Sequence, residues 1–152
     1  MSDVAFLNAL LTKLRLDVGA GSLVALTGGV ANIFRAPLPE KLRLPSVGVG
    51  IVSETALDPS VTGWKTYTVK ISGNAVREVD AITLSDRVQY LFDDVSGSET
   101  NRSFYDFTDS NCTVRSTRWL RKVPRVKHVD ENVTYWNDSN IIIIVANPYL
   151  GC

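Results

Sequence analysis

The order of helical and strand-like segments constrains this chain most. Apolar residues recur at three- and four-residue spacing over Ser2–Leu16 and about Val76–Val95, which predicts two amphipathic helices. Strand-like runs lie between them, at Val47–Val52 and Thr66–Ile71. After the second helix only strand-like sequence remains: Cys112–Lys122, Val133–Trp136 and Ile141–Val145. This order predicts an α+β fold: a largely antiparallel β-sheet of about four to six strands packed against two main α-helices.

The pattern also predicts which side chains are buried. The first apolar face contains Val4, Leu7, Leu10, Leu11 and Leu14, and the second contains Val79, Ile82, Leu84, Val88, Leu91, Phe92 and Val95. A short helical turn is expected at Ser22–Leu26, and Gly73 with Asn74 is expected to end the strand before the second helix. Ile141–Val145 is apolar on both faces, which predicts a central strand or one covered on both sides.

Bulk composition indicates one soluble domain over residues 1–152. The chain has 45% hydrophobic and 21% charged residues, which suits a single packed core. Its longest apolar run, Ile141–Ala146, is far too short for a membrane span, and no basic region followed by a long apolar segment opens the chain. We therefore expect synthesis in the cytoplasm and no membrane partner.

No residue pattern indicates catalysis or a cofactor. The glycine-rich spots, such as Gly48-x-Gly50, do not continue into a phosphate-binding motif. His128 is the only histidine, and no Ser or Cys lies at a spacing from it that indicates a catalytic pair. Cys112 and Cys152 are the only cysteines. We therefore predict that the protein is not an enzyme and that it has no catalytic, cofactor-binding or metal-binding residues.

Charge is unevenly distributed in a chain of zero formal net charge. From Arg77 to Asp109, eight acids face three arginines, a balance of −5; from Arg115 to Lys127, six bases and no acid give +6. Three interpretations of the basic run stay open: a solvated edge strand, nucleic acid contact through arginines beside Trp119, or a charged protein interface. Pro124 places the end of this strand at an edge or a bulge.

Simple alternation predicts how the bases are presented. It places Arg115 and Arg121 on one face of the strand and Arg118 and Lys122 on the other. If the run is an interface, its partner could be the acidic segment of a neighbouring copy. Unlike patches on identical subunits favour head-to-tail association, which makes a ring when the contact closes.

The layout of this chain resembles a known family of phage proteins. The resemblance rests on the helix opening at Phe6–Leu11, the proline-rich passage ending Leu44–Val47, the strand Trp64–Ile71 and the helix Ile82–Phe92. Over roughly residues 3 to 146, the chain is similar to the tail-terminator and tail-completion proteins of long-tailed bacteriophages (lambda-like tail terminators). The long stretch from Ser96 to Asn132, with its basic run, departs from the short turn usual in the family.

The resemblance implies a virion structural protein of the tail or neck. Such a protein forms a hexameric ring, caps the tail tube, ends tube polymerisation and gives the head its docking surface. Its implied partners are further copies of itself, the tail tube protein and a head–tail connector or stopper, with DNA only in transit through the lumen. Two alternatives stay open: another neck, connector or baseplate ring component, and a small ligand-binding α+β domain. The expected interface residues are Asp58, Trp64, Arg115, Arg118, Arg121, Lys122, Arg125 and Lys127.

Overall fold

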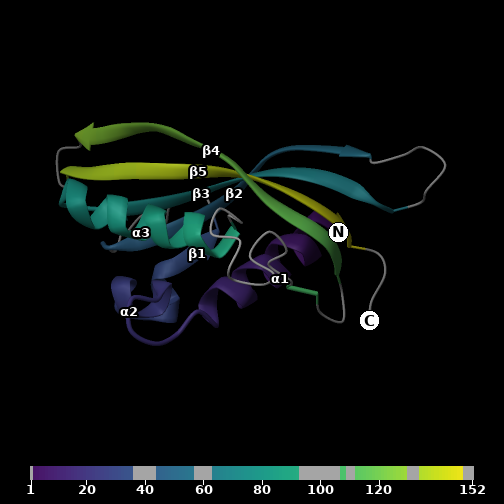
Figure 1. Ribbon diagram of the computed structural model, residues 1–152, viewed down its shortest axis with the longest axis horizontal. Coiled ribbons are helices and arrows are strands. Elements are labelled where there is room, and N and C mark those ends of the chain that lie inside the picture. Colours follow the sequence, from purple (N-terminus) through teal and green to yellow (C-terminus); the bar gives the residue numbers. More distant parts are fainter. Residues whose placement is uncertain are drawn as a thin grey trace.

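The computed structural model describes residues 2–35, 44–56, 63–92, 107–108, 112–129 and 134–148. Its helices are α1 (Ser2–Arg15), α2 (Leu23–Thr27) and α3 (Glu78–Phe92), with a 3-10 turn at Val30–Asn32. Its strands are β1 (Ile33–Arg35), β2 (Ser46–Ala56), β3 (Lys65–Ala75), β4 (Thr113–Val129) and β5 (Thr134–Asn147). The predicted α+β fold is confirmed (Figure 1).

The described strands form one sheet in the order β1-β2-β3-β5-β4. Only the short β1–β2 pair is parallel; the other pairs are antiparallel. The expectation of a central position for Ile141–Val145 is confirmed, because β5 lies between β3 and β4. The predicted run Val133–Trp136 is not a separate strand, since Thr134–Trp136 continues into β5 without a break. Polar residues hold this junction in the sheet: Asn137 donates to Asn74 of β3.

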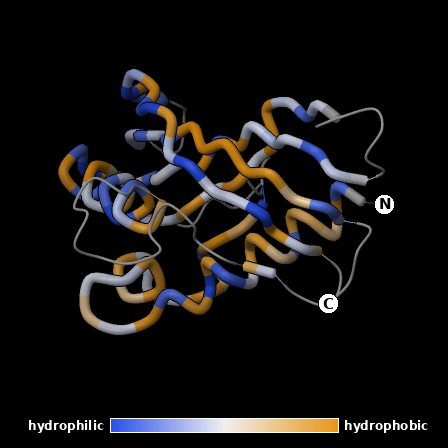
Figure 2. The backbone as a smooth tube through the Cα atoms, turned by 45° about the vertical axis from the view of Figure 1, so that its right-hand side comes forward, coloured by the Kyte–Doolittle hydropathy of each residue, from blue (hydrophilic) through white to orange (hydrophobic). Residues whose placement is uncertain are grey.

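The three helices that the structure describes lie on one side of the sheet, and the core lies between the two layers (Figure 1). Alternate strand residues face the helices, such as Val69 and Ile71 of β3 and Ile142 and Ile144 of β5, and all four are fully buried. Phe6 of α1 stacks on the Tyr67 ring at a centroid distance of 3.8 Å. In Figure 2 a long orange stretch runs along the sheet beside a strand coloured mainly blue and white, as expected for apolar β5 beside basic β4.

The predicted helices are confirmed over most of their length, and three other expectations need correction. Most positions on the two predicted apolar faces are buried, among them Leu10, Leu14, Leu84, Val88 and Leu91; Val95 lies outside the described residues. Two residues assigned to the apolar faces are instead exposed, Val4 at 41% and Val79 at 60%, because both lie in the first turns of their helices, past the edge of the core.

The third correction concerns Gly73, which does not end β3. The strand continues to Ala75, because Gly73 pairs with Val47 on one side and Asp138 on the other. Its missing side chain lets α3 approach the sheet closely: a Cβ there would lie 2.7 Å from Leu84 Cβ. Glycine inside a strand here marks close packing.

Asp17 joins three segments at the end of α1. Its carboxylate accepts the backbone N–H of Leu23 at 2.8 Å and two hydrogen bonds from Arg87 of α3, at 3.0 and 2.6 Å. Ser22 caps α2 by accepting from the Ala25 N–H, which confirms the predicted short helix. The two-pronged Arg87–Asp17 pair is largely shielded from water and fixes α3 against the N-terminal helices.

Candidate interaction surface on the edge strand

Strand β4 carries most of the predicted interface residues. It is an edge strand of the described sheet, paired only with β5. Its register shifts three times, between Val114 and Ser116, between Trp119 and Arg121, and between Val123 and Val126. The last shift contains Pro124, which confirms the prediction of an edge or bulge position. Each extra residue reverses the faces of the strand that follow it.

These shifts overturn the predicted distribution of the bases. Arg118 pairs with Ile143 and Arg121 with Ile141, so both point to the sheet face without helices. Lys122 pairs with Asn140 and points toward α3. The prediction that Arg121 and Arg118 lie on opposite faces was wrong, because it assumed unbroken alternation and the bulge at Leu120 adds one residue between them.

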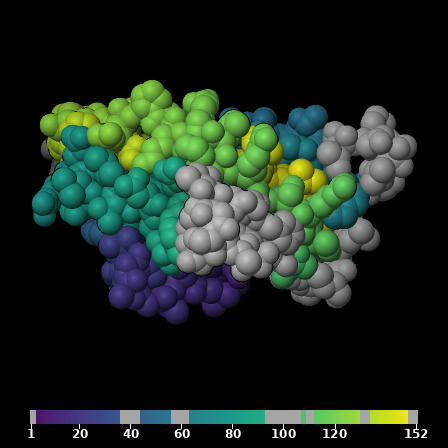
Figure 3. Space-filling model, viewed as in Figure 1, coloured from purple at the N-terminus to yellow at the C-terminus, as the bar shows by residue number. Residues whose placement is uncertain are grey.

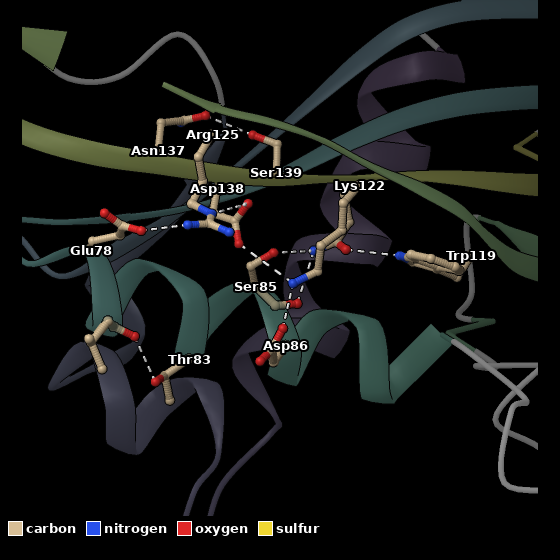
Figure 4. Close-up of polar contacts among 12 residues, drawn as sticks. Glu78, Thr83, Ser85, Asp86, Trp119, Lys122, Arg125, Asn137, Asp138 and Ser139 are labelled. Carbon is tan, nitrogen blue, oxygen red and sulfur yellow. Dashed lines mark hydrogen bonds and ion pairs between the residues drawn. The ribbon is translucent and has the colours of Figure 1, made fainter. Parts of the chain in front are cut away.

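Lys122 and Arg125 bridge the edge strand to helix α3. Lys122 Nζ contacts the Asp86 carboxylate, and Arg125 Nη1 lies 2.5 Å from Glu78 Oε1 (Figure 4). Both acids belong to the acidic segment noted in the sequence. One interpretation of the sequence was that the basic run contacts the acidic segment of a neighbouring copy. Part of that attraction is instead satisfied within one chain. Figure 3 shows β4, in green, covering the upper edge of α3 along the sheet.

Asp138 of β5 lies beneath these two cations. Its side chain is 3% exposed, with Oδ2 3.5 Å from Lys122 Nζ and Oδ1 3.8 Å from Arg125 Nε. Oδ2 makes no hydrogen bond within the described residues, so the contact is Coulombic. A buried carboxylate needs opposite charge nearby, and two cations supply it.

Asn140 completes this contact between β4, β5 and α3. Its side-chain oxygen accepts from Trp119 Nε1 at 2.9 Å, and its amide nitrogen donates at 2.9 Å to both the Ser85 carbonyl and the Ser85 hydroxyl. The polar seam is defined by Lys122, Arg125, Asp138, Asn140, Trp119, Ser85, Asp86 and Glu78. Figure 4 labels all of them except Asn140. It gives β4 a fixed position over α3 and leaves the bases on the opposite face without such partners.

The other predicted interface residues are scattered. Arg115 is exposed at the first register shift, and Lys127 lies over the Trp136 ring at 5.7 Å from its centroid. Trp64 is half-buried just before β3. Asp58 lies outside the described residues.

The structure adds residues that the sequence did not indicate. Lys70 of β3 pairs with Ile141, which also pairs with Arg121, so Lys70 joins Arg118 and Arg121 on the helix-free face. Asp138 and Asn140 were not singled out because they sit in a polar stretch that resembles a turn. Their signal was even spacing with Ile142 and Ile144, which places them on the core side of one strand.

A second charged cluster links α1 to the β2–β3 hairpin. Lys65 Nζ lies 3.5 Å from Asp3 Oδ1 and 3.4 Å from Glu54 Oε1, and the Tyr67 hydroxyl donates to Asp3 Oδ1 at 3.0 Å. The hydrogen bond with Asp3 raises the pKa of Glu54, and the same bond lowers the pKa of Asp3. Burial, with the bond to Asp3, raises the pKa of Tyr67 far above its ordinary value. This cluster is a structural contact between α1, the end of β2 and the start of β3.

The described part of the chain contains no group of three or more His, Cys, Asp or Glu side chains placed to hold a metal ion. None of the helices described is long and apolar enough to cross a membrane. His128 is exposed and stacks on Tyr135, and Cys112 is buried and forms no disulfide with another described residue.

Comparison with known proteins gives a likeness of fold. No protein-family model matches the sequence, and no curated protein matches it. Among solved structures, the fold is similar to that of a chain from the virion of a native gene transfer agent particle. The two chains share 20% sequence identity with a TM-score of 0.53, and the match covers 93% of this chain and 97% of the other.

Proposed function

We propose that this protein is a virion structural subunit that forms a ring at the end of a phage-type tail tube. The observation that carries the proposal is the likeness to a chain of a gene transfer agent virion, which covers nearly the whole of both chains. A match of that extent relates complete folds and not one shared motif. The sequence resemblance to tail terminators supports the same role independently.

In this role the ring caps the tube, ends its polymerisation and presents a docking surface to the head. The partners are further copies of the chain, the tail tube protein and a connector or stopper protein. The expected oligomer is a hexamer of about 100 kDa, six times the 16.7 kDa of one chain. A closed ring requires two different surfaces of each subunit to meet, which is a heterologous contact.

The architecture is suited to a subunit that contributes surfaces and no reaction. The polar seam fixes β4 over α3 and thereby holds the edge strand in a defined position. The exposed end of β4, where Val126 and Val129 are 47% and 77% exposed, offers apolar area to a neighbour. Apolar contacts would hold the ring, while exposed charges, each contributing about 0–1 kcal/mol, select the register.

Removal of the gene from a particle-producing genome tests this role. A terminator that is missing should leave tubes of uncontrolled length without heads, as seen by electron microscopy. Tails of normal length that fail to attach would instead indicate a connector, and absence of tubes would indicate a baseplate component. Two results together would favour the small ligand-binding domain. The protein would stay monomeric both alone and with the tube, and particles would assemble normally when its gene is removed.

A further inference from the structure

The helix-free face of the sheet carries three cations. Lys70, Ile141 and Arg121 form one row across β3, β5 and β4, and Thr68, Ile143 and Arg118 form the next. We call Lys70, Arg118 and Arg121, with Thr66 and Thr68, the cationic sheet face. Both arginines are exposed, whereas Lys70 and the two threonines are partly exposed.

The charge of this face is uncompensated within the described residues. Register places no aspartate or glutamate of a described strand on it: Asp138 and Glu54 pair with Gly73 and Tyr67, which face the helices. No described carboxylate forms an ion pair with the three cations. On the opposite face, Lys122 and Arg125 have carboxylate partners. The fold therefore separates neutralised bases from free ones on the same strand.

We propose that the cationic sheet face binds the phosphate backbone of double-stranded DNA. Arg118 and Arg121 lie opposite residues two positions apart on β5, about 6.8 Å along the strand. Lys70 and Arg121 lie two strands apart, about 9.6 Å. Phosphates of one DNA strand recur about every 3.4 Å along its axis, so cations at these spacings match phosphates about two and three steps apart. Threonine hydroxyls beside them supply further donors to phosphate oxygens.

A polyanion fits this face better than a second copy of the chain. A protein partner would have to present several free carboxylates, but Glu78 and Asp86 of α3 are already paired with Arg125 and Lys122. The apolar residue at the centre of the first row offers little contact area, since Ile141 is only 6% exposed between its cationic neighbours. Phosphate recognition uses charge and hydroxyl donors, and both are present.

The inference deepens the proposed function, because a ring through which DNA passes has a surface that faces the DNA. The binding itself does not require the ring. It predicts no base specificity, since only backbone contacts are involved. Three phosphate contacts predict that the logarithm of affinity falls with the logarithm of salt concentration at a slope of roughly −2.7.

Fluorescence anisotropy with a labelled duplex of about 20 base pairs tests the proposal, from about 0.05 to 0.2 M salt. The variant Arg118→Gln with Arg121→Gln should bind at least about tenfold more weakly at the lowest salt and lose roughly 1.8 from the slope. The matched control is Arg35→Gln with Arg77→Gln, which removes the same charge from two exposed arginines off this face. The control should bind nearly as the wild type does, and melting curves should coincide for all three proteins.

Equal weakening in test and control variants, or no wild-type binding at about 0.05 M salt, would overturn the proposal. If the test variant instead loses self-association while DNA binding is unchanged, the face contacts a second copy and the DNA assignment is wrong. Binding of DNA by a chain that never forms a ring would leave this inference standing and reject the proposed function, so the two failures are distinguishable.

Discussion

Replacing Gly73 with alanine tests how closely β3 and α3 approach. The new Cβ would lie 2.7 Å from Leu84 Cβ, 3.0 Å from the Ala81 carbonyl oxygen and 3.2 Å from the Ser85 amide nitrogen. None of these atoms is the end of a flexible side chain, so no rotamer change relieves the overlap. Overpacking of a well-packed core costs about 1–3 kcal/mol, and we expect about 2–3 kcal/mol because the helix itself must move.

The polar seam is the reason that α3 cannot move freely. A shift away from β3 would stretch the bonds from Asn140 to Ser85 and the contact between Arg125 and Glu78. At about 2–4 °C per kcal/mol for a chain of this size, the melting temperature should fall by roughly 4–12 °C.

Denaturant unfolding and thermal melting, followed by circular dichroism, measure the effect. The control is Gly29→Ala, since a Cβ at Gly29 would meet nothing within 4 Å. If Gly73→Ala stays within about 0.5 kcal/mol of the wild type, as ordinary surface substitutions do, the close contact between β3 and α3 is wrong.

Three further predictions concern the polar contacts. Arg87→Lys should lower the unfolding free energy by about 1.5–3 kcal/mol, because lysine cannot reproduce the two-pronged bond to Asp17; equal stability in urea would contradict that role. Asn140→Leu should cost about 1–3 kcal/mol and increase hydrogen exchange at the Trp119 indole, which loses its acceptor, so unchanged exchange would count against the seam. Glu54→Gln should raise stability by less than about 1 kcal/mol at neutral pH. The raised pKa means that the folded state holds the Glu54 proton more tightly, so wild-type stability falls as pH rises above the ordinary value of 4.5. The gain of the variant should therefore disappear as pH falls below 4.5.

The sequence predicted the elements that follow one regular period. The helix α3 and the alternating strand β3 were located because apolar spacing is a local property. The central position of β5 was also predictable, since five consecutive apolar residues, Ile141–Val145, require cover or neighbours on both sides. The local sequence pattern was sufficient to locate an element where apolar residues repeat regularly along it.

The faces of β4 were not predictable in the same way. Bulges depend on how a strand pairs with its neighbour, and the bulge at Leu120 reverses the alternation that places Arg121 and Lys122. Gly73 was misread for a related reason, because an interior glycine and a terminating glycine look alike until the packing of α3 is known. Asp138 and Asn140 acquire their roles only from partners distant in sequence.

The location and copy number of the chain in an assembled particle test the central claim most directly. A cryo-electron microscopy reconstruction of the particle should show six copies in one closed ring at the head-proximal end of the tail tube, with each subunit joined to the next by two different surfaces. Copies found at the distal end of the tail or within the head, or no copies in the particle, would contradict the account.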